Sequence, residues 1–302
     1  MFRTWDTTWD ETWDDQEKSL MRVWYERIVK EYTTKSLTLP KDSLPALSGL
    51  ARLVQKLSGS KYFAGLWEHD LLAGLGWRVV SDSARFPHDP VYRAPSWSWA
   101  AVDTPVDWFF ARTGADQDED NSIPIVKDIQ VHSIGQDKEG QVSGGYLLIS
   151  TFGRRIYNRV LHASELEGNV TYVLGGPRTR ICQIYAHNSA SENKNIGELF
   201  LDCMDSLSDG QLVVVAKILG GPDWQREEGE EERPQQALAL VELKEDEIHR
   251  LRDQQGAMEG RERISRWDSE DTKVFRRIGF VRIFGGFRDW LNNTTREDFL
   301  II

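Results

Sequence analysis

The sequence predicts an α+β fold in which a helical N-terminal quarter packs on an antiparallel, β-rich body of sandwich or barrel type. Apolar residues recur at helical spacing in the first quarter of the chain. Beyond Pro105, short apolar or alternating runs are separated by Gly, Pro, Asn and Asp, which is typical of strands joined by turns. The chain has 302 residues, 40% of them apolar, so it can bury a sizeable core. We expect residues 1–90 to form the helical region and residues 91–302 the β-rich body, within one integrated domain.

The first residues contain a repeated Thr-Trp-Asp triplet, which places Trp5, Trp9 and Trp13 four residues apart. On a helix this spacing makes one aromatic stripe with an acidic stripe beside it. We expect this Trp-rich arm to be an amphipathic helix or arm docked on the body. A helix that lies on a membrane surface would carry basic residues on its polar face, and these are acidic.

Two helices are expected after the arm. The first, over residues 17–32, has one apolar face and ends before Thr33. The second is capped by Asp42 or Ser43 and has Pro45 in its first turn. The apolar positions of this second helix are Leu47, Leu50, Ala51, Val54 and Leu57.

A third helix is expected from Tyr62 or Gly65 to Leu75, although its glycines weaken it. The body that follows is expected to be made of short strands. These strands are expected at residues 123–133, 145–155, 169–174, 180–185, 212–219, 237–243 and 275–284. Two acidic tracts, at residues 116–120 and within 220–234, are expected to be solvated loops, because a run of like charges cannot pack densely. A charged helix is expected over residues 245–266.

The most aromatic stretch of the body is YRAPSWSWAAVD, residues 92–103. Pro95 favours an extended backbone before it, and the alternation that follows predicts a strand with Trp97 and Trp99 on one face. Each indole buries a large area and brings one N–H group that needs an acceptor. The strand can therefore be a core strand with two large side chains, or one aromatic wall of a ligand pocket.

Composition excludes several classes of function. The chain has 37 basic and 48 acidic residues, and no basic stripe stands out, so nucleic acid and anionic membranes are not expected as partners. The start of the chain is acidic and polar where a signal peptide would be apolar, and no apolar run is long enough to cross a membrane. Cys182 and Cys203 cannot form a disulfide framework or a structural zinc site, which favours a reducing, cytoplasmic compartment.

Four phrases of the sequence together resemble the region that follows the effector portion of fungal heterokaryon-incompatibility (HET) domain proteins. They are WYERIVKEYTTKSLTLPKDSLPALSGLA (24–51), YFAGLWEHDLLAGLGW (62–77), YRAPSWSWAAVD (92–103) and FRRIGFVRI (275–283). The resemblance implies a link to fungal self/non-self recognition. Only 23 residues precede Trp24, so we expect the TIR-like effector region, with its NAD-cleaving activity, to be absent.

The sequence contains no recognisable catalytic motif. His88, between two prolines, and Asp103, after the Trp pair, are the two candidates for acid–base chemistry, and a surface turn explains each as well. The adjacent Glu68, His69 and Asp70 would point apart on a helix. The histidines lack metal-ligand spacing, and there is no phosphate-binding loop, so neither a metal nor a cofactor is expected. In FRRIGF, one arginine of the pair 276–277 is expected to point inward and pair with a carboxylate.

Two functional hypotheses remain. In the first, the chain binds a hydrophobic small molecule and acts as a cofactor-independent cyclase or isomerase of fungal terpenoid or polyketide metabolism. An intramolecular cycloaddition is an example, because such a reaction needs chiefly a pocket of the right shape with apolar walls. Its substrate-binding residues would be Trp67, Tyr92, Trp97, Trp99 and Trp108. In the second, the chain is a non-catalytic interaction or regulatory module related to HET proteins, and it binds a protein partner through its aromatic face or through the arm with Trp5, Trp9 and Trp13.

Overall fold

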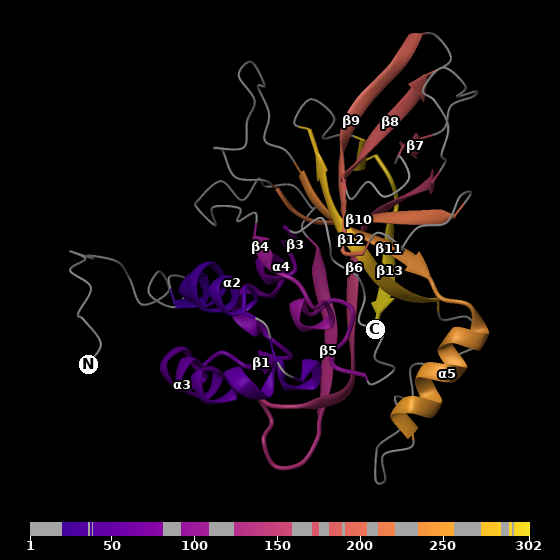
Figure 1. Ribbon diagram of the computed structural model, residues 1–302. Helices are drawn as coiled ribbons and strands as arrows, with labels where there is room; N and C mark the ends of the chain where they lie inside the picture. The colour runs from indigo at the N-terminus through magenta and orange to yellow at the C-terminus, as the bar shows by residue number, and fades with distance from the viewer. Residues whose placement is uncertain are drawn as a thin grey trace, which may run out of the picture.

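A computed structural model describes most of the chain (Figure 1). The described residues are 20–35, 37, 39–80, 92–108, 124–158, 171–174, 181–188, 191–203, 211–220, 235–256, 273–284, 290–291 and 293–302. Within them, a helical N-terminal region packs on a large β-rich body, which confirms the predicted fold class. The Trp-rich arm, the tract at 116–120, residues 221–234 of the second acidic tract, and His88 lie outside these residues.

The first described helix covers residues 20–32 and ends at Tyr32, as predicted, while residues 17–19 of the predicted helix lie outside the described residues. Its middle is wound as a π-helix, η1 (Trp24–Val29), and its last turn is α2 (Lys30–Tyr32). The wide π turn places the neighbouring Trp24 and Tyr25 in the core together, both with no exposed surface. This helix therefore supplies two large aromatic side chains to the core from consecutive positions.

The next segment consists of the short 3-10 turns η2 (Pro40–Asp42) and η3 (Pro45–Leu47), followed by α3 (Ser48–Ser58). The predicted cap is wrong, because Pro45 starts a 3-10 turn and neither Asp42 nor Ser43 is its N-terminal cap. The Leu47 N–H instead bonds the carbonyl of Leu44, 3.1 Å away, so the turn closes through the backbone. The helix ends at Gly59, whose φ of +70° lets the chain leave the helix.

Only part of the predicted apolar face of α3 is buried. Ala51 and Val54 lie in the core, whereas Leu50 and Leu57 are 41% and 62% exposed. Leu50 and Leu57 are three or four residues from Val54, so they lie at the edge of the buried face, where the core no longer covers the helix.

The third predicted helix is wrong over its first half. Residues 62–67 form a hairpin of β1 (Tyr62–Phe63) and β2 (Leu66–Trp67), and only then follow η4 (Glu68–Asp70) and α4 (Leu71–Gly74). The cause is the turn between the strands, where Ala64 and Gly65 have φ values of +44° and +98°. Two consecutive left-handed residues interrupt a helix and suit a two-residue hairpin turn.

The strand predicted around Trp97 and Trp99 is also wrong. The Ser98 N–H bonds the carbonyl of Pro95 at 2.9 Å, which closes a turn, and Trp99–Ala101 form the 3-10 helix η5. The Ser98 hydroxyl accepts the Ala100 N–H at 3.1 Å and so caps η5. Capping serines and large aromatic residues alternate here, which imitates the period of a strand. The next strand is β4 (Val106–Trp108), which pairs with β3 (Trp77–Val79).

The body contains one nine-stranded sheet. All seven strands expected from the sequence are present, some of them longer than expected, and β9 and β13 were not expected. The strands are β5 (Ile125–Ser133), β6 (Val142–Asn158), β7 (Thr171–Leu174), β8 (Ile181–Asn188), β9 (Ser191–Leu201), β10 (Leu212–Gly220), β11 (Gln235–Glu242), β12 (Val274–Ile283) and β13 (Arg296–Ile301). Helix α5 (Glu245–Gly256) follows β11, within the predicted helical segment.

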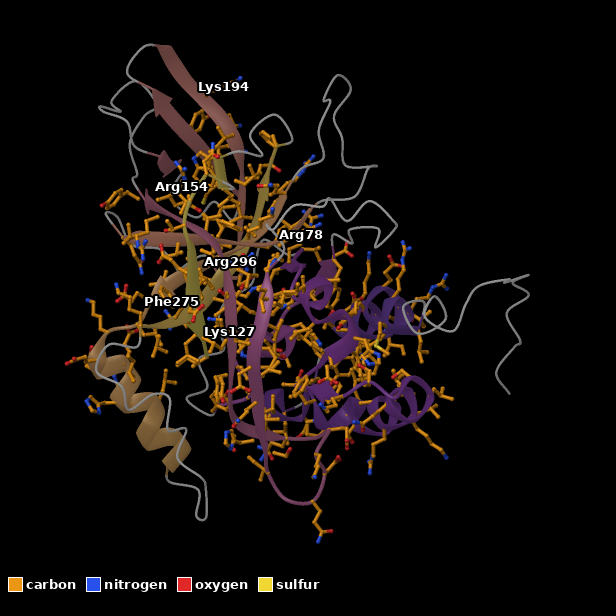
Figure 2. The ribbon with its side chains drawn as sticks, turned by 180° about the vertical axis from the view of Figure 1, so that it is seen from behind. Arg78, Lys127, Arg154, Lys194, Phe275 and Arg296 are labelled. Carbon is orange, nitrogen blue, oxygen red and sulfur yellow. The ribbon has the colours of Figure 1, made fainter. Side chains whose placement is uncertain are left out.

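The sheet closes on itself. Strands β10, β11, β12, β13 and β6 are neighbours in that order, and β10 also pairs with β6, so they form a five-stranded barrel. Most pairings are antiparallel, as predicted, but β12 with β13 and β6 with β7 are parallel. On the outer surface the ion pair Lys127–Asp298, 2.7 Å long, joins β5 to β13, on the side seen in Figure 2.

The two regions share one core. Alternate residues of the barrel strands, among them Val214, Leu238 and Phe280, belong to the same buried cluster as the aromatic residues of the helical region. The residues between them on each strand, such as Val213 and Ala237, belong to a second cluster. The helical region is thus held by the sheet face on which it rests.

Candidate functional site

The aromatic side chains predicted as ligand contacts lie together. Trp67, Trp97 and Trp99 are at most 1% exposed, Trp108 is 6% exposed, and the half-buried Tyr92 packs against the same cluster. They adjoin Trp24, Tyr25 and Trp77 of the helical region, which are also buried. We call the set Trp24, Tyr25, Trp67, Trp77, Trp97, Trp99 and Trp108 the aromatic core. The structure brings the predicted residues together, and their role as ligand contacts stays a prediction.

Two indoles of the aromatic core share one acceptor. The Nε1 groups of Trp24 and Trp99 each donate to the carbonyl of Gly65, both at 3.0 Å. The hairpin turn presents this carbonyl to them, and a Cβ at Gly65 would lie 2.3 Å from Trp99 Nε1. Glycine is therefore required here both for its positive φ and for the close approach of the indole.

Other aromatic groups are tied to the backbone in the same way. Trp77 Nε1 donates to the carbonyl of Trp97 at 3.0 Å, and Trp108 Nε1 donates to that of Gly74 at 2.9 Å. The Tyr25 hydroxyl accepts the Trp67 N–H at 3.2 Å. Burial, with the Asp70 charge adding to it, holds the pKa of Tyr25 well above its usual range, so this hydroxyl stays protonated. These bonds join segments that are distant in the sequence.

Four polar atoms of this cluster have no hydrogen-bond partner among the described residues. They are Trp67 Nε1, Trp97 Nε1 and the hydroxyls of Tyr62 and Tyr92, and all four are buried. Burial also raises the pKa of Tyr92, so its hydroxyl remains a neutral donor at physiological pH. A buried donor without an acceptor is costly, so these atoms are positions at which an acceptor group would be stabilising.

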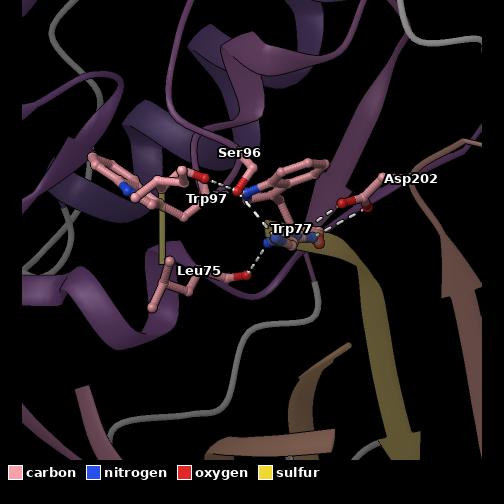
Figure 3. A network of polar contacts seen from close by, with 7 residues as sticks. Leu75, Trp77, Ser96, Trp97 and Asp202 are labelled. Atoms are coloured by element: carbon pink, nitrogen blue, oxygen red, sulfur yellow. Dashed lines mark hydrogen bonds and ion pairs between the residues drawn. The ribbon is translucent and has the colours of Figure 1, made fainter. Parts of the chain in front are cut away.

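A buried ion pair lies beside the aromatic core (Figure 3). Arg277 on β12 and Asp202 just after β9 are 1% and 2% exposed, with Nε and Oδ2 2.9 Å apart. The guanidinium also donates to the carbonyls of Leu75 and Trp77, and it lies 3.4 Å from the centre of the Trp77 ring. Burial lowers the pKa of Arg277 and Asp202 opposes this, so the group keeps its charge. This confirms the inward arginine predicted from FRRIGF.

The main chain of Arg277 adds a further link. Its N–H donates to the Ser96 hydroxyl at 3.0 Å, and that hydroxyl donates to the carbonyl of Ile302. The ion pair and Ser96 therefore join the helical region, the 92–101 segment, the sheet and the C-terminal residue. Each nitrogen of the guanidinium is bonded and the side chain is fully buried, so Arg277 acts as a structural connector.

The structure describes only one of the two acid–base candidates. His88 lies outside the described residues. Asp103 has a side chain 52% exposed, and its Oδ1 lies 3.8 Å from Nη1 of the buried Arg93. Arg93 also donates to the carbonyl of Ala101 at 3.2 Å, so the two residues close the loop after η5. Asp103 as an acid–base group stays a prediction.

The residues 68–70 do not converge. Glu68 forms an exposed ion pair with Lys61, 2.8 Å long, and the His69 N–H bonds the Ser60 hydroxyl. In the part of the chain that the structure describes, no group of three His, Cys, Asp or Glu residues could hold a metal ion. Among the described helices, none combines the length and apolarity needed to cross a membrane.

The sequence analysis missed an exposed apolar surface on α3. Leu50, Leu53 and Leu57 are 41%, 46% and 62% exposed, and on the helix they lie next to the buried face formed by Ala51 and Val54. We call these three residues the leucine row. The sequence does contain a signal for the leucine row. The apolar residues of α3 cover a wider sector of the helix than one buried face needs, so some of them must be exposed. An exposed apolar row of this kind marks a surface that contacts another segment or molecule.

Comparisons of the chain with protein family models, with curated proteins and with solved structures found no match. The functional argument therefore depends on the geometry of the aromatic core, the buried ion pair and the leucine row.

Proposed function

We propose that this chain is a non-catalytic interaction module that binds a partner through the leucine row. The observation that carries the proposal is the exposure of three leucines on a helix whose neighbouring face is fixed in the core. Arg52 and Lys56 are exposed beside the row. The partner that fits this chemistry is an amphipathic helix with an apolar stripe and acidic flanks.

Kinship with the region that accompanies the effector of HET proteins is part of the proposal. Its support is that residues from all four phrases meet: Trp24, Gly65 and Trp99 share a carbonyl, and Arg277 bonds Ser96 and Trp77. Four phrases that specify one shared core are consistent with one inherited fold. A regulatory role, in which the module binds an effector or its partner in the cytoplasm, follows from this kinship.

A second candidate is the binding, and the cofactor-free cyclisation or isomerisation, of a hydrophobic small molecule. The specific observation in its favour is the set of buried donors on Trp67, Trp97 and Tyr92. A carbonyl or ether oxygen of a terpenoid or polyketide would satisfy them. The first candidate ranks higher, because the other four buried indoles of the aromatic core already donate to backbone carbonyls.

Binding to a partner from the source organism tests the first candidate. A protein retained from its extract would be identified and purified, and its Kd measured for the native chain, for Leu53→Asp and for Tyr157→Asp. Leu53→Asp should weaken binding at least about tenfold, because it places a charge against an apolar contact. Tyr157 is similarly exposed, at 46%, but lies on β6, so its variant should bind normally. Equal Kd values for the native chain and Leu53→Asp would refute the proposal.

Native mass spectrometry of the chain purified from the source organism tests the second candidate. A retained metabolite should be lost in Trp97→Phe, which removes the N–H group and keeps an aromatic ring. If no metabolite is retained, or if Trp97→Phe retains it fully, the ligand hypothesis is rejected.

A further inference from the structure

The leucine row has the dimensions of a helix-docking surface. Leu50 to Leu57 spans seven residues of α3, which is about 10 Å along the helix axis. The row follows the i, i+3, i+7 spacing that presents a continuous ridge to a second helix. Arg52 and Lys56 lie on one flank of this ridge. A partner helix should therefore carry an apolar stripe of similar length and acidic residues beside it.

Residues 1–19 of the same chain have this pattern. Trp5, Trp9 and Trp13 span eight residues, which on a helix is about 12 Å. Their spacing of four is that of the i±4 ridge, which packs into the grooves of a neighbouring helix. The lengths of the two apolar stripes thus agree.

The charges of the two segments are complementary. Residues 1–19 contain six acidic and two basic residues. Asp6, Asp10 and Asp14 each follow one of the tryptophans, so on a helix they would lie on the flank of the aromatic stripe. Docking would bring this acidic flank close to Arg52 and Lys56. Such pairs add specificity of orientation more than affinity.

The arm can reach α3. The described chain begins at Leu20, and the helix that starts there lies beside α3 at the same edge of the molecule in both ribbon views (Figures 1 and 2). The six residues between Trp13 and Leu20 span up to about 20 Å when extended. A segment tethered this closely has an effective concentration in the millimolar range.

We infer that the Trp-rich arm of residues 1–19 docks on the leucine row and is its intramolecular occupant. This inference rests on the proposed function, and it adds a form of regulation. The arm covers the same surface that binds the external partner, so the partner must displace it. An acidic, tryptophan-bearing helix in the partner would compete on equal terms with the arm.

The alkylation rate of a single engineered thiol measures whether the row is covered. The native Cys182 and Cys203 are 2% and 1% exposed, so Leu53→Cys in the full chain provides the reactive thiol. The rate at which this thiol reacts with a maleimide is measured in two proteins. Both carry Leu53→Cys; one has the native arm, and the other also carries Trp5→Ala, Trp9→Ala and Trp13→Ala. Tyr157→Cys, at a similarly exposed position on β6, is the matched control.

The inference predicts that the native arm slows alkylation of Leu53→Cys by about tenfold, because a tethered segment occupies a site of modest affinity most of the time. Thr8→Pro keeps all three indoles and interrupts the helix, so it should also raise the rate. The rate at Tyr157→Cys should be the same in every arm variant. Circular dichroism confirms that each variant is folded.

Equal rates at Leu53→Cys in the native and substituted arms would overturn the inference. So would a protection that disappears on dilution together with a dimer mass in light scattering, because a second copy of the chain would then be the occupant. The proposed function fails by a different result, namely an unchanged Kd of the partner for Leu53→Asp. An uncovered row that still binds the partner would therefore reject only the intramolecular docking.

Discussion

The aromatic core and the leucine row are two groups of large apolar side chains in the same helical region. Trp24, Trp67 and Trp99 are at most 1% exposed, whereas all three leucines of the row are at least 41% exposed. An indole buries its ring and also donates an N–H group, so it can tie distant backbone segments together while it fills space. A leucine has no such donor. The difference suggests that the abundant tryptophans hold the fold, and that the less conspicuous leucines are available for contact with other molecules.

The largest expected effect comes from breaking the buried ion pair. Asp202→Ala leaves the Arg277 charge buried without its carboxylate, which should lower the free energy of unfolding by about 3–5 kcal/mol. Asp298→Ala is the matched control, because the Lys127–Asp298 pair is roughly half exposed and should contribute less than about 1 kcal/mol. Urea unfolding measures both. Similar losses in the two variants would mean that the buried pair does not connect the layers.

Gly65→Ala should have the next largest effect. The substitution adds a Cβ in a left-handed backbone and against Trp99 Nε1, so the expected loss of stability is about 2–4 kcal/mol. Gly135→Ala has a similar φ, +77°, and no atom within 4 Å, so only the backbone cost of about 1–2 kcal/mol applies. The difference between the two variants isolates the contact with the indole. No difference would show that Trp99 moves aside without cost.

The shared carbonyl of Gly65 predicts a coupling between Trp24 and Trp99. Trp24→Phe or Trp99→Phe alone leaves the carbonyl one donor, whereas the double variant leaves it none. The double variant should therefore lose about 1–3 kcal/mol more than the sum of the single losses. Trp24→Phe combined with Trp77→Phe, whose acceptors differ, should be additive within about 0.5 kcal/mol. Equal coupling in both cycles would argue against the shared acceptor.

The smallest expected effect is a gain in stability. Tyr92→Phe removes a buried hydroxyl without a partner, so the free energy of unfolding should rise by about 1 kcal/mol at neutral pH. Burial raises the pKa of Tyr92 in the folded state above the unfolded value near 10. The stability that comes from keeping this hydroxyl protonated is therefore fully present below about pH 10 and is lost as the pH rises further. Tyr92→Phe should therefore make the alkaline loss of stability less steep. A destabilised Tyr92→Phe would indicate a bonded hydroxyl.

Several features were predictable from local sequence. The expected strands, the helix that ends at Tyr32 and the inward arginine of FRRIGF follow from periodicity and turn residues, which act over a few positions. The turn at Ala64 and Gly65 was not predictable in this way. Alanine rarely adopts a left-handed backbone, and here the turn is held by the hydrogen bonds that Trp24 and Trp99, distant in the sequence, donate to the Gly65 carbonyl. The 92–101 segment was taken for a strand because capping serines imitate alternation. The partner of Arg277 lies 75 residues away, and no local pattern specifies it.

The exposed side of α3 was not predictable for a related reason. Periodicity identifies apolar positions, but it cannot tell how wide a sector of the helix the rest of the molecule covers. Ala51 and Val54 contact the core, and Leu50 and Leu57 do not, although all four are apolar. The extent of coverage depends on how the rest of the molecule packs against the helix, which the local pattern does not specify.

The unfolding free energies of Trp99→Ala and Leu53→Ala test the contrast between the two groups most directly. Trp99→Ala should cost about 3–5 kcal/mol, because it leaves a cavity and removes one donor from the Gly65 carbonyl. Leu53→Ala should cost less than about 1 kcal/mol in the variant with the substituted arm, because Leu53 is 46% exposed in the folded body and lies outside the buried cluster. A Trp99→Ala protein as stable as the native chain would contradict the structural role of the indoles.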